Sequence, residues 1–269
     1  MDKELLVILN DFVDIMRRTD WVLGAWNFGS AAHELTDKYS DADVVFLVGG
    51  KDLADAEESL KRLISGVCDE VILCWEEDFN SDSIINNGYL LEKDRRIFQF
   101  DVFLLSKDRI DDYICKIHYT DLSERDIIFD KDGSVLTLAE NCPHGEFWGD
   151  DTDRLIRTYL YHFGMSAKYL LRGDYFKLNR VMRVLYDTHS SLLLTEYDRI
   201  KWGGAESKLR FIPEEKKRHL TQYYCTENFA EDRKRLACCF EWFGEDSGGF
   251  GRINWNAIKK YWSASTQNI

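Results

Sequence analysis

The fold we predict follows from residues 27–48, NFGSAAHELTDKYSDADVVFLV. They give the end of an apolar strand, a turn at Gly29 and Ser30, a ten-residue loop, and a second strand entered through Asp41 and Asp43. Side chains alternate between the two faces of a strand, so Asp41 and Asp43 are expected on the same face. Neighbouring carboxylates repel each other unless a cation lies between them. Hard oxygen ligands of this kind suit Mg²⁺, which binds through one or two carboxylates and phosphate groups.

Gly29 and Ser30 supply a second part of the predicted site. Glycine lets the backbone approach a phosphate closely, and successive backbone N–H groups with a serine hydroxyl form an anion-binding concavity. Taken singly, a Gly-Ser pair carries no weight, and an Asp-x-Asp pair is usually a solvated turn or strand edge. In this order and spacing, the combination favours metal-assisted phosphoryl or nucleotidyl transfer.

This arrangement resembles the nucleotidyltransferase superfamily that includes DNA polymerase beta. Those enzymes carry a third carboxylate on a later, adjacent strand, and here the apolar segment 98–104, FQFDVFL, offers Asp101. The resemblance implies that Asp41, Asp43 and Asp101 are the catalytic residues and the ligands of Mg²⁺, and that Gly29 and Ser30 bind the nucleotide. It also implies ATP as the nucleotide donor. Asp101 would complete a second metal site and act as general base, or the metal would lower the pKa of the attacking hydroxyl.

The first half of the chain alternates between helical and strand patterns. Apolar spacing predicts a first helix that contains Leu5 and Met16, and a turn is predicted at Asn86-Asn87-Gly88. A hairpin with the charged tip 93–96 is expected to carry Asp101 to the metal site. The remaining predicted elements are strands at 21–28, 41–48, 67–75 and 127–129 and a helix at 53–64.

From residue 151 onward the pattern becomes helical. One long helix is predicted to end at Gly173, a second long helix follows, and Pro213 marks a helix start. Arg172-Gly173-Asp174-Tyr175 between the two long helices is similar to the helical domain of bacterial antibiotic nucleotidyltransferases, the lincosamide and streptomycin (aminoglycoside) adenylyltransferases. We therefore predict an α+β protein in which a nucleotidyltransferase fold, a mixed sheet flanked by helices, precedes a helical bundle. The predicted domains are a nucleotidyltransferase domain, 1–145, and a helical substrate-binding domain, 146–269.

The composition is that of a globular protein, and its charge bears on partners. The 269 residues are 45% hydrophobic and 31% charged, with a net charge of −13. Phosphate backbones are held by clustered Lys and Arg, so no nucleic-acid partner is expected. The acidity is compatible with a cationic small substrate, although acidic solubility explains it equally well.

The cysteines and the N-terminus indicate a cytoplasmic protein. Seven cysteines form no CxxC pair, and their odd number favours reduced thiols in an intracellular protein over a disulfide framework. The N-terminus is charged and helical in pattern, unlike a signal peptide, and no apolar run reaches membrane length. We therefore expect no membrane partner.

These observations favour an enzyme of antibiotic resistance, an adenylyltransferase that transfers AMP from ATP to a hydroxyl of an aminoglycoside or a lincosamide. Two alternatives stay open at this point. The acceptor is a protein or tRNA, as in nucleotidyltransferases of toxin–antitoxin systems, or the chain binds a nucleotide without turnover. The sequence leaves open which hydroxyl is modified, the nucleotide preference, the residues of the substrate pocket and the oligomeric state.

Overall fold

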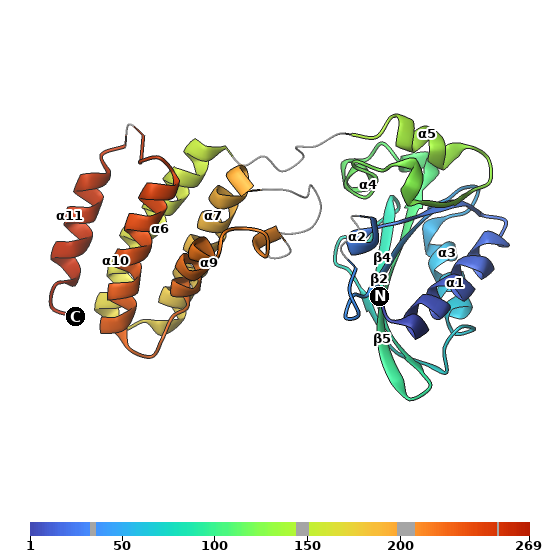
Figure 1. The fold of residues 1–269 in the computed structure, drawn as a ribbon, viewed down its shortest axis with the longest axis horizontal. Helices are drawn as coiled ribbons and strands as arrows, with labels where there is room; N and C mark the ends of the chain where they lie inside the picture. Colours follow the sequence, from blue (N-terminus) through green and yellow to red (C-terminus); the bar gives the residue numbers. More distant parts are fainter. Residues whose placement is uncertain (33–35, 144–150, 198–207, 252) are drawn as a thin grey trace. The chain divides into compact units, whose positions relative to one another are not determined.

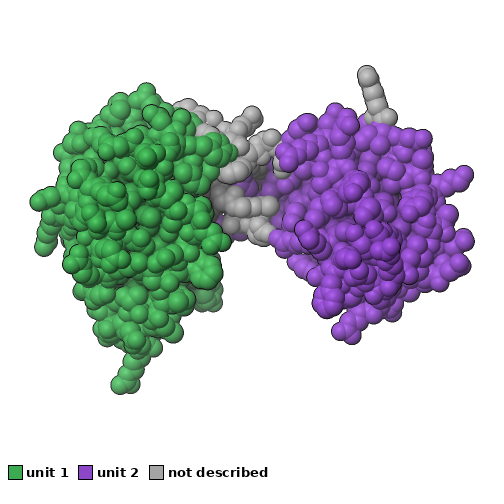
Figure 2. All heavy atoms as spheres, turned by 180° about the vertical axis from the view of Figure 1, so that it is seen from behind, with its two compact units in different colours: residues 1–147 green, residues 148–269 purple. Residues whose placement is uncertain are grey.

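The computed structural model divides the chain into two compact units, Met1–Phe147 and Trp148–Ile269, which Figure 2 colours separately. The predicted boundary between residues 145 and 146 lies outside the described residues. The structure describes residues 1–32, 36–143, 151–197, 208–251 and 253–269.

The first unit contains a six-stranded sheet with the strand order β3-β4-β5-β2-β1-β6. The central pair, β2 and β5, is parallel, and every other adjacent pair is antiparallel. The sheet is therefore mixed, as predicted. Its strands are β1 (Val22–Asn27), β2 (Ala42–Val48), β3 (Glu70–Glu76), β4 (Ile84–Lys93), β5 (Arg96–Ser106) and β6 (Ile127–Asp130).

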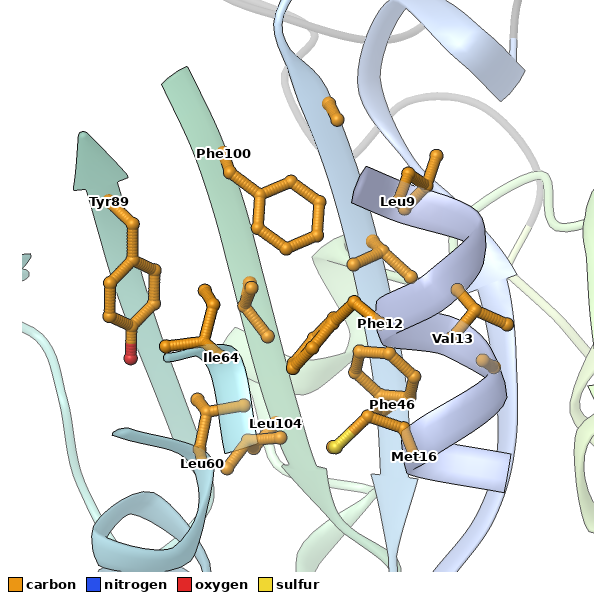
Figure 3. Packing of buried hydrophobic residues seen from close by; sticks show 14 of the residues in the cluster. Leu9, Phe12, Val13, Met16, Phe46, Leu60, Ile64, Tyr89, Phe100 and Leu104 are labelled. Carbon is orange, nitrogen blue, oxygen red and sulfur yellow. The ribbon is translucent and has the colours of Figure 1, made fainter. Parts of the chain in front are cut away.

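Two amphipathic helices, α1 (Lys3–Arg17) and α3 (Leu53–Ile64), lie on one side of this sheet (Figure 1). Each begins at an aspartate whose side chain accepts a hydrogen bond from a backbone N–H in the first turn, which stabilises a helix start. Phe12 of α1 points between Phe46 of β2 and Phe100 of β5 (Figure 3). Its ring lies edge-on to theirs, with centroids 5.7 and 5.4 Å away. This contact fixes the first helix to the two central strands.

The opposite face of the sheet is covered along part of its length. Helices α4 (Tyr113–Ile117) and α5 (Ser134–Glu140) contribute to a second apolar cluster on that face. On β5 this cluster includes Phe103 and Leu105. The next residue of β5 on the same face is Asp101, so a charged residue follows directly after the apolar cluster on this strand.

One local prediction is wrong. Asn86-Asn87-Gly88 forms no turn but lies within β4, which pairs with β3 on one side and β5 on the other. Side-chain hydrogen bonds hold the segment in place: Asn80 donates to the backbone carbonyl of Asn86 and accepts from its N–H, and Asn87 donates to Glu57 over 2.8 Å. These contacts override the local preference of Asn and Gly for turns. The predicted hairpin with its tip at residues 93–96 is confirmed, since β4 and β5 pair up to Lys93 and Arg96.

The second unit is helical, as predicted. Gly173 ends the first long helix with a φ of 61°, a left-handed conformation that glycine adopts at low cost. In the core, the ring of Tyr159 stacks on Phe243 with centroids 3.7 Å apart. No described helix has both the length and the apolar character needed to cross a membrane. The helices are α6 (Thr152–Arg172), α7 (Tyr175–Tyr197), α9 (Glu214–Leu220), α10 (Phe229–Asp246) and α11 (Trp255–Thr266).

Phe12 provides a test of the first unit's packing. Phe12→Ala removes a fully buried ring between two others, so we expect a loss of about 3–5 kcal/mol in the free energy of unfolding. Leu6→Ala, on the same helix but 45% exposed, should change it by less than about 0.5 kcal/mol. Urea unfolding measures both, and equal midpoints for the two variants would contradict the packing described here.

Candidate metal and phosphate site

The pairing of β2 with β5 brings together the three predicted carboxylates. Asp43 and Asp101 lie directly opposite each other in the parallel register, and Asp41 stands two residues before Asp43. Each offers a carboxylate oxygen, and these three oxygens lie within 4.8 Å of one another. The side chains therefore converge, although they come from strands distant in the sequence.

The cluster is electrostatically unfavourable without a cation. Burial, and after it the charges of Asp41 and Asp101, raise the pKa of Asp43 to about 8. Burial also raises the pKa of Asp101, a hydrogen bond from Gln99 opposes the rise, and the charges of Asp41 and Glu77 add to it. A divalent cation would relieve both the desolvation and the mutual repulsion.

Gly29 lies against this cluster. The predicted Gly-Ser turn is the start of a four-residue helix, α2 (Gly29–Ala32), and Gly29 has a φ of 63°. A Cβ at this position would lie 2.1 Å from Oδ2 of Asp43, so a larger residue would displace the carboxylate. The backbone N–H of Phe28 donates to the carbonyl of Asp43 over 3.2 Å, which ties the segment to β2. The positive φ and the close approach together require glycine here.

Ser30 carries a buried polar group. Its Oγ is buried and has no hydrogen-bond partner among the described residues. Leaving a buried hydroxyl unpaired costs about 1–3 kcal/mol, so such a group in a native protein calls for an explanation. An oxygen of a bound phosphate would satisfy it. The residues thus fit a metal–phosphate ligand: carboxylates for the cation, and, one residue after the glycine that contacts Asp43, a buried hydroxyl with no partner in the described part of the chain.

Two neighbours of Asp101 were missed in the sequence. Gln99 donates from Nε2 to Oδ2 of Asp101 over 3.0 Å, and the alternation of faces along β5 was sufficient to find it. Gly88 lies opposite Asp101 on β4, where a Cβ would approach Oδ1 to 2.7 Å. Nothing local in the sequence marks Gly88, because its position depends on the pairing of β4 with β5.

Comparisons with known proteins give no family for this chain. No family model and no curated protein matches its sequence. Among solved structures, an aminoglycoside 6-adenyltransferase from Bacillus subtilis aligns with 98% of this chain and 99% of its own, at 12% identity and a TM-score of 0.37. A TM-score this low does not establish a common fold, so the functional argument rests on the site itself.

The raised pKa of Asp43 predicts a pH-dependent stability of the metal-free protein. Between its ordinary value of 3.8 and about 8, the folded state keeps a proton that the unfolded chain has released. The free energy of unfolding therefore falls as pH rises, by about 1.4 kcal/mol per pH unit for this one proton. Asp43→Asn should remove that slope. Urea unfolding at pH 6 and 7 with a chelator compares the two proteins, and identical slopes would argue against the assignment.

Metal binding provides a second test. Mg²⁺ should raise the thermal midpoint of the wild type, since a ligand at about 100 times its Kd stabilises the folded state by about 2.7 kcal/mol. Asp43→Asn and Asp101→Asn should lose this shift. Asp111→Asn, which alters a carboxylate 94% exposed and outside the cluster, should keep it. A shift of equal size in all four proteins would place the metal elsewhere.

Proposed function

We propose that this protein is a magnesium-dependent nucleotidyltransferase that transfers AMP from ATP to a hydroxyl of a small-molecule antibiotic, an aminoglycoside or a lincosamide. One observation carries the proposal: Asp41, Asp43 and Asp101 offer oxygens within 4.8 Å of one another, and Gly29 against Asp43 is followed by Ser30, whose buried hydroxyl has no hydrogen-bond partner among the described residues. Phosphoryl transfer needs positioned phosphates and neutralised charge more than covalent chemistry, and this combination supplies both.

The carboxylates and the Gly29–Ser30 segment would have separate roles. Asp41 and Asp43 would hold Mg²⁺, which supplies charge neutralisation at the phosphates and acidifies a bound hydroxyl. Ser30 would hydrogen-bond a phosphate oxygen, while Gly29 gives the phosphates access to the backbone next to Asp43. Each of these contacts fixes the triphosphate before the reaction, which is where most of the rate enhancement would arise.

Asp101 would complete the metal site and receive the proton of the acceptor. A carboxylate that reaches the acceptor hydroxyl would take its proton as general base, or Mg²⁺ would lower the pKa of that hydroxyl. The acceptor oxygen then forms a bond to the α-phosphorus, the bond from that phosphorus to the bridging oxygen of the β-phosphate breaks, and pyrophosphate leaves. Gln99, hydrogen-bonded to Asp101, would hold the carboxylate in place during the transfer.

The acceptor class rests on the sequence resemblance and on charge. The helical part, 146–269, is proposed to bind the acceptor, as the sequence resemblance around Arg172-Gly173-Asp174-Tyr175 implies. The net charge of −13 is compatible with a cationic acceptor, and aminoglycosides carry several amines.

Transfer of label tests this function. The wild type with Mg²⁺ and α-labelled ATP should label one member of a panel of aminoglycosides and lincosamides and release pyrophosphate. Asp43→Asn and Asp101→Asn should lower the rate by at least about 10²-fold, the effect of removing a group that acts in the transition state. Asp111→Asn, outside the cluster, should retain the wild-type rate.

Other outcomes of the same assay are informative. Label on tRNA or on protein would replace the acceptor class proposed here. If Mg-ATP binds but no acceptor leads to pyrophosphate release, the protein binds a nucleotide and is not an enzyme of this kind.

A further inference from the structure

A row of four residues crosses four neighbouring strands at the carboxylate cluster. Trp75 of β3 pairs with Gly88 of β4, Gly88 with Asp101 of β5, and Asp101 with Asp43 of β2. Residues that lie directly opposite on adjacent strands share a face of the sheet. One strand, β4, lies between Trp75 and Asp101, and its residue at this place is Gly88.

The strand between them carries no side chain at this point. A Cβ at Gly88 would lie 2.7 Å from Oδ1 of Asp101 and 3.9 Å from Cβ of Trp75. The carboxylate of Asp101 therefore lies over Gly88, in the space that a side chain at this position would occupy, and Cβ of Trp75 borders the same space. Because Gly88 has no side chain, nothing from β4 separates the indole of Trp75 from Asp101.

The surroundings of Gly88 on this face are apolar and acidic. Trp75 is 62% exposed, and Leu73, two residues before it on the same face of β3, is 47% exposed. Glu77 lies close enough for its charge to act on Asp101. Exposed apolar side chains that gather beside polar groups are typical of a binding surface, and an indole bordered by carboxylates suits a ring with an apolar C–H face and a cationic substituent.

We propose that Trp75 and Gly88 form the subsite for the ring of the acceptor that carries the reacting hydroxyl. The ring lies with its C–H face against the indole, its hydroxyl reaches the carboxylate of Asp101 above Gly88, and an amine of the acceptor lies towards Glu77. This inference rests on the proposed function and adds to it a residue, Trp75, that determines acceptor affinity without touching the nucleotide. A small ring is favoured over a macromolecular partner because the indole stands next to Asp101, so a single ring on the indole brings its own hydroxyl to that carboxylate.

Steady-state kinetics of the full-length protein test this subsite. Trp75→Ala should raise the KM for the acceptor about tenfold, since a ring or cation contact with an indole contributes about that factor, and should leave the KM for ATP unchanged. Trp75→Phe, which keeps an aromatic face, should restore most of the affinity. Ile72→Ala is the matched control: Ile72 is 44% exposed, lies on the same edge strand at a register shift, and pairs with no residue of β4.

The outcomes separate the subsite from the proposed function. If the wild type transfers no label to any acceptor, the proposed function fails, and the subsite with it. If the wild type is active and Trp75→Ala has the wild-type KM for the acceptor, only the subsite is overturned. An equal rise in both KM values, or an equal effect of Ile72→Ala, would show a general disturbance of the edge strand and would also overturn the subsite. A lower thermal midpoint for Trp75→Ala with no change in KM would show that the indole contacts another part of the chain instead.

Discussion

The repulsion among three carboxylates is the constraint on which the rest of this site depends. Parallel pairing of β2 with β5 places Asp43 opposite Asp101, and Asp41 stands beside them. A folded chain keeps such a group together only if the rest of the structure outweighs the cost. Burial worsens the cost, as the raised pKa of Asp43 shows, and it also makes the site responsive to a cation. The same arrangement thus lowers the stability of the metal-free protein and is the basis of the proposed chemistry.

The stabilising contribution comes from the reverse side of the same two strands. Phe46 alternates in direction with the aspartates along β2, and Phe100 does so along β5, and both rings contact Phe12. Each strand therefore carries acidic residues on one face and core residues on the other. Because the core contacts fix the register, the carboxylates cannot separate by sliding the strands. Core packing therefore keeps the three carboxylates close together despite their repulsion.

The segment before β2 is also shaped by the cluster. Gly29 has a left-handed backbone and no room for a Cβ because Asp43 occupies that space, while the buried hydroxyl of Ser30 has no hydrogen-bond partner in the part of the chain that the structure describes. Neither feature improves stability in the absence of a ligand. Both are consistent with a backbone shaped around a phosphate group. Trp75 and Gly88 lie in the same cross-strand row as Asp43, on the other side of Asp101. The row therefore runs from the proposed phosphate site to the proposed site for the acceptor ring.

Local patterns were sufficient for most of the elements. Helical spacing located the first helix, alternation placed Asp41 and Asp43 on one face, and glycine marked the end of the first long helix at Gly173. Local patterns failed at Asn86-Asn87-Gly88, where two asparagines and a glycine favour a turn, but pairing with β3 and β5 and the contact of Asn87 with Glu57 hold the segment in a strand. Propensity describes a segment alone, whereas a central strand is stabilised by its neighbours.

The amino-acid sequence alone fixed the types of residue at the site and the faces on which they lie. Through a family resemblance it indicated Asp101 as the third carboxylate, but it did not indicate which residue of β2 lies opposite Asp101. The tertiary structure alone decided that Asp101 lies opposite Asp43 and that Gly88 and Trp75 continue the row. The physical reason is that side-chain alternation is a property of one strand, while register depends on hydrogen bonds and core contacts between residues remote in the chain.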